Sequence, residues 1–280
     1  MSSPLALLFP YDGPMSDDEV GITVMASFAW LITGLVWVHR LRHRKHVLGA
    51  TPWKRALQWS GLQAVAVVYV VLELWSASDV RDDARYLYMY SAIGGAWIGL
   101  AMLFTPLFGL STVDDVVERR NPAAALALLG LPFAIALAYA GGNIGDGPGW
   151  WVVFFSSGVA TLVLALLVTS SLSLGRAADS LTVERDVATG VRFALVSIAE
   201  GLVLGRAAAG DWVSAEATLI DLAARGWPAL VLGAVAVVLD RGLRPTPESP
   251  RRSVFACGVV PGLALLAAAC VWVVRLGALP

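Results

Sequence analysis

The feature that most constrains this chain is a run of about twenty residues without a charged side chain, between Asn121 and Gly142. Alanine, glycine and leucine dominate the run, which reads PAAALALLGLPFAIALAYAG. An α-helix needs about 20 apolar residues to cross the hydrocarbon core of a bilayer. Small side chains let neighbouring membrane helices approach closely. The run therefore predicts a membrane helix that packs tightly against others.

Seven more apolar segments of similar length occur along the chain. The eight segments cover about residues 20–40, 55–76, 86–109, 121–141, 149–173, 186–208, 217–240 and 253–275. None alternates as a β-strand does, and a backbone exposed to lipid must satisfy its own hydrogen bonds, so all eight are predicted to be helices. Only 15% of the residues are charged, against about 25% in soluble domains. We therefore predict an all-α, polytopic integral membrane protein that forms a single membrane domain.

Basic residues are unevenly distributed among the connections between these segments. The odd-numbered connections hold fourteen of the twenty lysines and arginines, six of them between Arg40 and Arg55, and the even-numbered connections hold two. Cytoplasmic loops of membrane proteins are enriched in lysine and arginine. We expect the odd connections to lie in the cytoplasm and both termini to lie outside.

The segments also form a repeating pattern of four helical hairpins. Their ranges are about 20–76, 86–141, 149–208 and 217–275. In each, an apolar helix is followed by a charged connection and then by a helix rich in small residues. Asn121 and Asp186 stand at equivalent positions before the second helix of the two middle units, and both are good helix N-caps.

The middle of the chain resembles a known family. The stretches ERRNPAAALALLG and ERDVATGVRFALVSIAEGLVLGRAAAG, about 65 residues apart, are similar to the YjfL-like bacterial membrane proteins, the domain-of-unknown-function family 350. The resemblance covers about residues 88–210. It implies tandem two-helix units in a bacterial inner (plasma) membrane. It also implies a link to envelope stress, but no catalytic residues, since none are defined for the family.

Ionisable side chains within the membrane segments are the strongest functional signal, because a charge in hydrocarbon is costly. Glu200 and Arg225 each lie about 12 Å below the outer end of their helices, so we expect them to meet. Arg206 and Asp221 form a second, shallower pair by the same reasoning, and Asp221 shares a helix face with Arg225. These four residues are interpreted either as a structural ion-pair clamp or as the lining of an ion or solute path.

A fifth charged residue, Arg192, lies about two helical turns from the cytoplasmic end of its segment. A long arginine side chain at that depth can extend to the interface with its charge in water. We therefore leave Arg192 out of the expected network.

Other kinds of site are disfavoured. His39 and His43 share a helix face with metal-ligand spacing, but their basic neighbours, including those around His46, favour an anchor for anionic lipid instead. The sequence contains no His-Glu-x-x-His, Gly-x-Ser-x-Gly or phosphate-loop motif. A net charge of −1 gives no indication of nucleic-acid binding. We expect no enzyme activity, no metal site and no cofactor.

Two functions remain open. The first is a transporter- or channel-like protein for an ion or small cation, with Glu200 facing the cation. The second is a non-transporting membrane scaffold or envelope-stress-sensing subunit. The lipid bilayer is the expected partner, and a homo-oligomer and a cytoplasmic partner are both compatible with the sequence.

Overall fold

The computed structural model describes residues 15–42, 52–250 and 252–279. Within these ranges the regular secondary structure is all helical, with no β-strand. The α-helices are α1 (Asp17–Arg42), α3 (Pro52–Trp75), α4 (Ser78–Arg81), α5 (Ala84–Leu103), α6 (Pro122–Gly141), α7 (Trp150–Ser173), α8 (Ala177–Thr182), α9 (Val187–Ala208), α10 (Ala215–Gly242) and α11 (Val260–Arg275). Three short segments have other helical geometry: η1 (Thr105–Phe108) is a 3₁₀-helix, and η2 (Thr112–Glu118) and η3 (Val254–Val259) are π-helices.

In the described part of the chain, eight helices are long and apolar enough to cross a membrane. They are α1, α3, α5, α6, α7, α9, α10 and η3–α11 together, so the expected all-α fold and the number of apolar helices are confirmed. The third helix ends earlier than the segment 86–109 suggested. Pro106 stands in the first turn of η1 and Gly109 has a φ of 88°, which a side chain would oppose.

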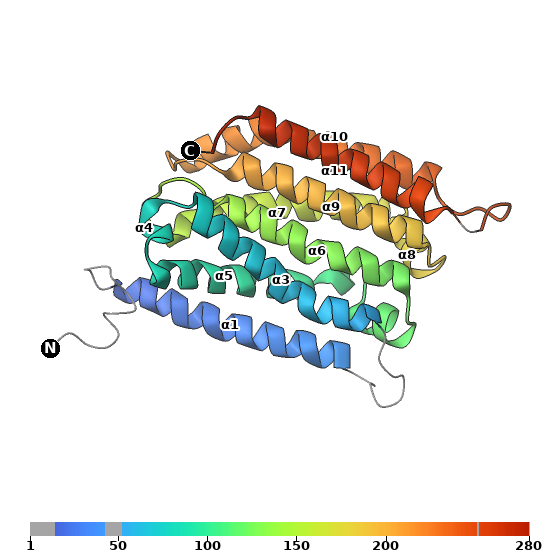
Figure 1. Cartoon of the computed structure of the whole chain (residues 1–280), viewed down its shortest axis with the longest axis horizontal. Coiled ribbons are helices and arrows are strands. Elements are labelled where there is room, and N and C mark those ends of the chain that lie inside the picture. Colours follow the sequence, from blue (N-terminus) through green and yellow to red (C-terminus); the bar gives the residue numbers. More distant parts are fainter. Residues whose placement is uncertain (1–14, 43–51, 251, 280) are drawn as a thin grey trace.

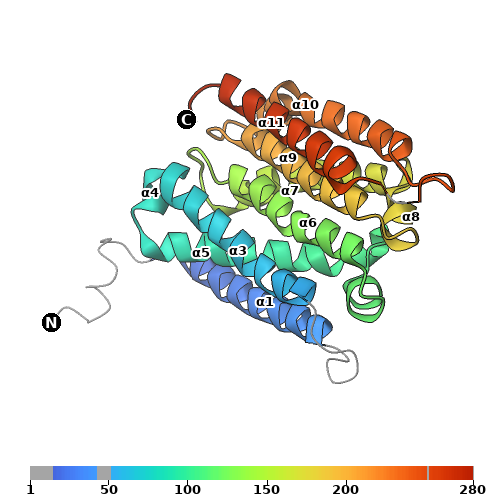
Figure 2. The same ribbon diagram turned by 45° about the vertical axis from the view of Figure 1, so that its right-hand side comes forward.

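The eight long helices run side by side in two rows (Figure 1). One row is α3, α6, α9 and α11, in which each helix packs against the next. The other row is α1, α5, α7 and α10, with α1 against α5 and α7 against α10. Figure 2 shows the same order after a turn of 45°. The chain alternates between the rows, so every helix packs against the one that follows it.

Helices α6 and α9 occupy the centre of the first row and are the most buried of the eight. Glycines bring their backbones into contact. A methyl group on Gly201 would lie 2.3 Å from the carbonyl oxygen of Ala134, and one on Gly205 would lie 2.2 Å from that of Leu137. The small residues of α6 and α9 therefore allow the close helix contact that the sequence predicted.

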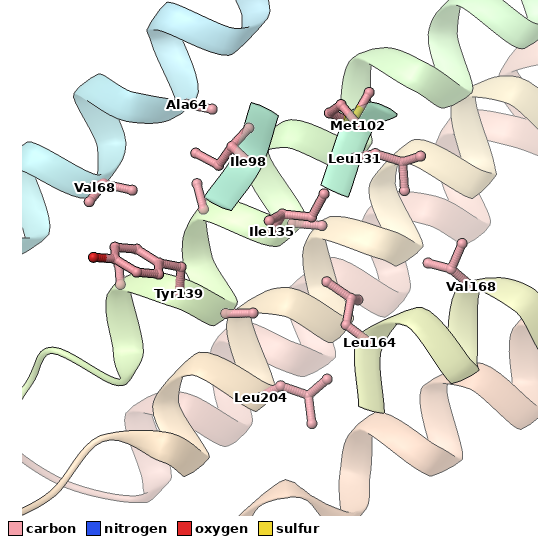
Figure 3. Packing of buried hydrophobic residues seen from close by; sticks show 14 of the residues in the cluster. Ala64, Val68, Ile98, Met102, Leu131, Ile135, Tyr139, Leu164, Val168 and Leu204 are labelled. Carbon is pink, nitrogen blue, oxygen red and sulfur yellow. The ribbon is translucent and has the colours of Figure 1, made fainter. Parts of the chain in front are cut away.

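Larger apolar side chains fill the space around this contact (Figure 3). Val68 of α3, Ile98 of α5, Ile135 of α6, Leu164 of α7 and Leu204 of α9 all belong to one buried cluster. The cluster also holds residues of α1, α10 and α11, so all eight long helices share one core. The α6–α9 pair forms a rigid centre against which a polar side chain on α9 can be held in place.

Candidate functional site: charged side chains between α7, α9 and α10

Helix α9 carries the candidate site, and Asp186 caps its first turn. The Asp186 carboxylate accepts hydrogen bonds from the Thr189 amide and hydroxyl, at 2.9 and 2.7 Å. Asn121 stands at the same position of α6 and accepts from the amides of Ala123 and Ala124. Its side-chain amide also donates to the Leu181 carbonyl at 2.6 Å, which ties the start of α6 to α8. Both residues expected to be caps lie at N-cap positions.

Arg192 and Asp240 form a buried ion pair between α9 and α10. The Arg192 Nη2 and Nε atoms lie 2.7 and 2.9 Å from Asp240 Oδ1, and the two side chains are 1% and 2% exposed. Ser171 of α7 donates to the other carboxylate oxygen at 2.7 Å. The guanidinium also donates to the carbonyl of Cys257 and to the hydroxyl of Thr189. The pair joins four helical segments and has no solvent contact.

Arg192 was expected to extend to the interface, and this expectation is wrong. Asp240 is close enough to hold the guanidinium inside the bundle, and a buried charge paired and hydrogen-bonded in this way avoids much of the desolvation penalty. Sequence reasoning assigned Asp240 to the end of a segment, as part of the loop that follows. The sequence signal that could have revealed this pair is the position of the two charges. Arg192 lies two turns from the start of its segment, and Asp240 is the last residue of the next segment, which runs back to the same side.

Glu200 lies two turns further along α9, and it is 2% exposed. Its Oε1 atom is buried and has no hydrogen-bond partner. A methyl group placed on Gly233 of α10 would lie 3.2 Å from this oxygen and 2.7 Å from Leu167 of α7. The glutamate therefore points at a glycine, in a space enclosed by α7 and α10.

The expected contact between Glu200 and Arg225 does not form. Arg225 instead donates to the Ala209 carbonyl at 3.4 Å and lies 3.6 Å from Asp221. Asp221 and Arg225 thus share a face as expected, but both side chains are partly exposed, at 51% and 38%. The residue of α10 that faces Glu200 is Gly233, eight positions and about 12 Å further along the helix.

Glu200 and Arg225 do not meet because of the register between α9 and α10. The depth comparison assumed that α9 and α10 end at the same level. In the structure Gly226 packs against Ala207, and Gly233 packs against Glu200. Helix α10 therefore begins well beyond the last turn of α9. The residues at both ends of the connection, Ala209 and Ser214, are extended, so six residues can span this distance.

Arg206 also departs from the expected network, because it does not pair with Asp221. Its Nη2 atom lies 3.1 Å from the Ala278 carbonyl and 3.4 Å from those of Leu276 and Gly277. Its Nη1 atom is buried without a partner. These carbonyls follow the end of α11, where cationic groups are favoured by the helix dipole. Arg206 therefore binds the end of the last helix.

A third ion pair lies beyond the ends of the long apolar helices α9 and α10, near the Arg192–Asp240 pair in sequence. Arg244, just after α10, donates to Glu184, just before α9, at 2.6 and 2.8 Å. These hydrogen bonds raise the pKa of the Arg244 guanidinium above its ordinary value. The two helices are thus joined by ionic contacts both inside the bundle and outside it.

The arrangement can hold a proton or a cation at one point. Glu200 offers an unpartnered carboxyl oxygen in a space without solvent, while the Arg192 charge is already balanced by Asp240. In the described part of the chain no group of three or more His, Cys, Asp or Glu residues could hold a metal ion. His43 and His46 lie outside the described residues.

Comparison with known proteins adds no relative. No family model, curated protein or solved structure matches the chain. The resemblance to the YjfL-like family stays a prediction that rests on the two motifs alone.

Proposed function

We propose that this chain is a multi-pass membrane protein that moves a proton or another small cation, with Glu200 as the residue that the cation binds. One observation carries the proposal: the Glu200 carboxyl group lies well inside the long apolar helix α9 with one oxygen unpartnered. Such a group is costly in a membrane protein. A structural role would leave it hydrogen-bonded, as Asp240 is.

The surroundings of Glu200 support a cation rather than an anion. The buried arginine nearest in sequence, Arg192, is neutralised by Asp240, and Arg225 is bonded elsewhere. A cation at Glu200 would therefore meet a free carboxylate. Because Gly233 has no side chain, α10 does not cover the Glu200 Oε1 atom at this position. We assign no catalytic residue and no cofactor to this site.

Flux into sealed vesicles tests the proposal. The purified protein is reconstituted, a potassium or proton gradient is imposed, and uptake is followed with an ion-sensitive dye. We expect flux above that of empty vesicles, lost in Glu200→Gln and kept in Asp221→Asn, which changes a partly exposed acid that does not contact Glu200. Flux that is equal in the parent and in Glu200→Gln contradicts the role of Glu200.

A non-transporting scaffold is the second candidate, and the packing around Glu200 favours it. The carboxyl group is enclosed by Gly233 and Leu167, and Glu200 lines none of the five best-defined cavities of the described structure. Transport would then require this region to open. If the parent protein shows no flux of any tested ion, the scaffold is favoured and its cytoplasmic loops become the candidate partner surface.

The proposal includes four hairpin repeats, and the connections before α6 and α9 support it. In the first, the amides of Arg119 and Asn121 donate to the carbonyls of Asp114 and Asp115, at 3.0 and 2.9 Å. In the second, Glu184 and Asp186 donate to Asp179 and Ser180 at the same distances. Arg120 and Arg185 both have a positive φ, 51° and 54°. The two turns are equivalent residue by residue.

The proposed membrane is the bacterial inner membrane, with both termini outside. Cysteines introduced at Gly147 and Ala178, in a background without Cys257 and Cys270, test this arrangement; Gly147 is used because it is exposed and leaves room for a side chain. We expect an impermeant maleimide to label the Gly147→Cys protein in intact cells, and the Ala178→Cys protein only after the cells are opened. Labelling of both in intact cells contradicts the topology.

A further inference from the structure

An apolar cavity of about 180 Å³ lies between α1, α3 and α5, and Glu200 is not among its lining residues. Gly34 of α1 and Gly61 of α3 both line it, and a methyl group added to either would meet no atom within 4 Å. Its described lining residues include no Asp, Glu, Lys or Arg, and Gln58 has the longest polar side chain among them. The cavity is therefore an apolar space that the side chains of α1 and α3 leave unfilled at these two glycines.

Helix α1 lies close against α5, and the cavity lies beside this contact. A methyl group on Gly95 of α5 would lie 2.7 Å from the Trp30 ring, and one on Gly99 would lie 2.2 Å from Thr33 Oγ1. All four residues line the cavity. The glycines of α5 therefore fix the position of α1, and the space between α1 and α3 stays open.

Basic residues stand one helical turn beyond the cavity on both helices. Arg42 follows Val38 by four residues, and Lys54 and Arg55 precede Gln58 by four and three. Residues three or four apart lie on the same helix face. Helix α1 ends and helix α3 begins at the same end of the bundle (Figure 1). Three basic side chains therefore lie beyond one end of the cavity.

Towards the other end of the cavity, α1 and α3 carry acidic residues only. On α1 the charged residues before Trp30 are Asp17, Asp18 and Glu19. On α3 the charged residue after Val65 is Glu73. The charges of these two helices therefore attract an anionic group to one end of the cavity and repel it from the other.

The depth of the cavity matches one leaflet of a bilayer. Val65 lies ten residues after Arg55, and Trp30 lies twelve residues before Arg42. At 1.5 Å per residue these lengths are about 15 and 18 Å along the helices. Half of the hydrocarbon core of a bilayer is about 15 Å thick. An acyl chain that enters beside the basic residues therefore reaches the deep end of the cavity.

A helix of a partner protein does not fit between α1 and α3. The Trp37 indole of α1 donates to the Leu57 carbonyl of α3 at 3.0 Å, so the two helices contact each other beside the cavity. An α-helix with its side chains is about 10–12 Å across. A single hydrocarbon chain is much thinner, and it leaves no polar group unpaired in an apolar space.

We propose that this cavity binds one acyl chain of an anionic phospholipid, whose phosphate lies beside Arg42, Lys54 and Arg55. Basic side chains near a membrane surface attract anionic lipids in general. The cavity adds a place for the chain, so one lipid is held at one position. The site is independent of Glu200, and the tests below measure lipid binding alone.

Thermal unfolding of the purified protein in an uncharged detergent, at constant ionic strength, tests the proposal. A ligand that binds only the folded state raises the melting temperature. We expect a saturable rise with dioleoylphosphatidylglycerol, which has two chains and a negative charge. Dioleoylphosphatidylcholine has the same chains without a net charge and should give a smaller rise. Glycerol 1-phosphate has the charge without a chain and should give none.

Filling the cavity should remove the rise. Gly34→Leu and Gly61→Leu each place a side chain in the cavity, and both positions have open space for it. Gly21→Leu is the matched control, because Gly21 of α1 also has nothing within 4 Å of a new methyl group but lies outside the cavity lining. Each variant is compared with its own melting temperature without lipid. We expect the rise with dioleoylphosphatidylglycerol to be lost in the first two variants and kept in the control.

Removing charge should weaken only the binding of the anionic lipid. A basic residue near the surface strengthens that binding about fivefold. The double variant Arg42→Gln/Arg55→Gln should therefore need about 25 times more dioleoylphosphatidylglycerol for the same rise, with no change for dioleoylphosphatidylcholine. Arg81→Gln is the control, since Arg81 is exposed in α4, which follows the opposite end of α3.

Several results would overturn the proposal. Equal rises with the two lipids in the parent would remove the role of the basic residues, and an equal rise with glycerol 1-phosphate would indicate a site for a free anion. A rise that is unchanged in both Gly34→Leu and Gly61→Leu would place the lipid elsewhere. A protein that is dimeric by light scattering without added lipid, and monomeric as Gly61→Leu, would make the cavity a contact between two copies of the chain.

Discussion

The buried Arg192–Asp240 pair gives the sharpest test of how this bundle is held together. Asp240→Asn keeps the shape of the side chain and removes its charge, which leaves the Arg192 guanidinium unbalanced at 1% exposure. Removing one partner of a buried ion pair costs about 3–5 kcal/mol. An arginine cannot lose its proton to escape this cost. We therefore expect Asp240→Asn to be destabilised by an amount in that range.

The opposite substitution should cost less. Arg192→Met leaves the Asp240 carboxyl with the Ser171 hydroxyl at 2.7 Å, and a stranded carboxylate can bind a proton and become neutral. The double variant strands neither charge, so it should be more stable than the sum of the two changes predicts. Residues that contact each other show coupling of about 0.5–3 kcal/mol in such a cycle.

Reversible unfolding in mixed detergent micelles, followed by fluorescence of the 11 tryptophans, measures these differences. Glu200→Gln and Arg225→Gln form the control cycle, because the two side chains do not touch. Their effects should add to within about 0.5 kcal/mol. If Asp240→Asn unfolds like the parent, or if the Arg192–Asp240 cycle shows no coupling while the control cycle does, the buried pair does not stabilise the bundle.

Three further predictions concern packing, capping and pH. Gly201→Ala forces a methyl group onto the α6 backbone and should cost about 1–3 kcal/mol by overpacking. Gly61→Ala has nothing within 4 Å of the new methyl group, so it should be neutral or stabilising. The same unfolding assay compares the two variants. Asn121→Ala removes a helix cap worth about 1 kcal/mol, so it should lower the unfolding free energy by at least that amount, and Asn121→Ser, which keeps an uncharged capping oxygen, should lower it less. Asp83 accepts hydrogen bonds from Arg85, with a closest distance of 2.6 Å, and these lower the pKa of the Asp83 carboxyl. Its contribution to stability is therefore complete above the unfolded pKa of about 4 and is lost as the pH falls through the lower folded value. An Asp83→Asn variant whose melting temperature falls below pH 4 as much as that of the parent would contradict this.

Local sequence was sufficient for the helices themselves. Hydrophobicity and length depend only on neighbouring residues, so all eight apolar helices could be predicted, most within two or three residues of their ends. The caps Asn121 and Asp186 are equally local, since an N-cap side chain bonds to amides of its own first turn. The depth of Glu200 within its helix was also predictable, and it is buried as that depth requires.

Which charges meet was decided only by the tertiary structure. Partner choice depends on the register between α9 and α10, and that register depends on how far the connection from Ala209 to Ser214 extends. A connection of six residues allows two helices to end level or about ten residues apart, and the sequence contains no local signal that distinguishes these cases. The extended connection brings Asp240 opposite Arg192, and it leaves Glu200 facing Gly233 rather than Arg225. Close packing of small residues against α6 then fixes α9 in that position, because helix backbones in contact cannot slide without clashes.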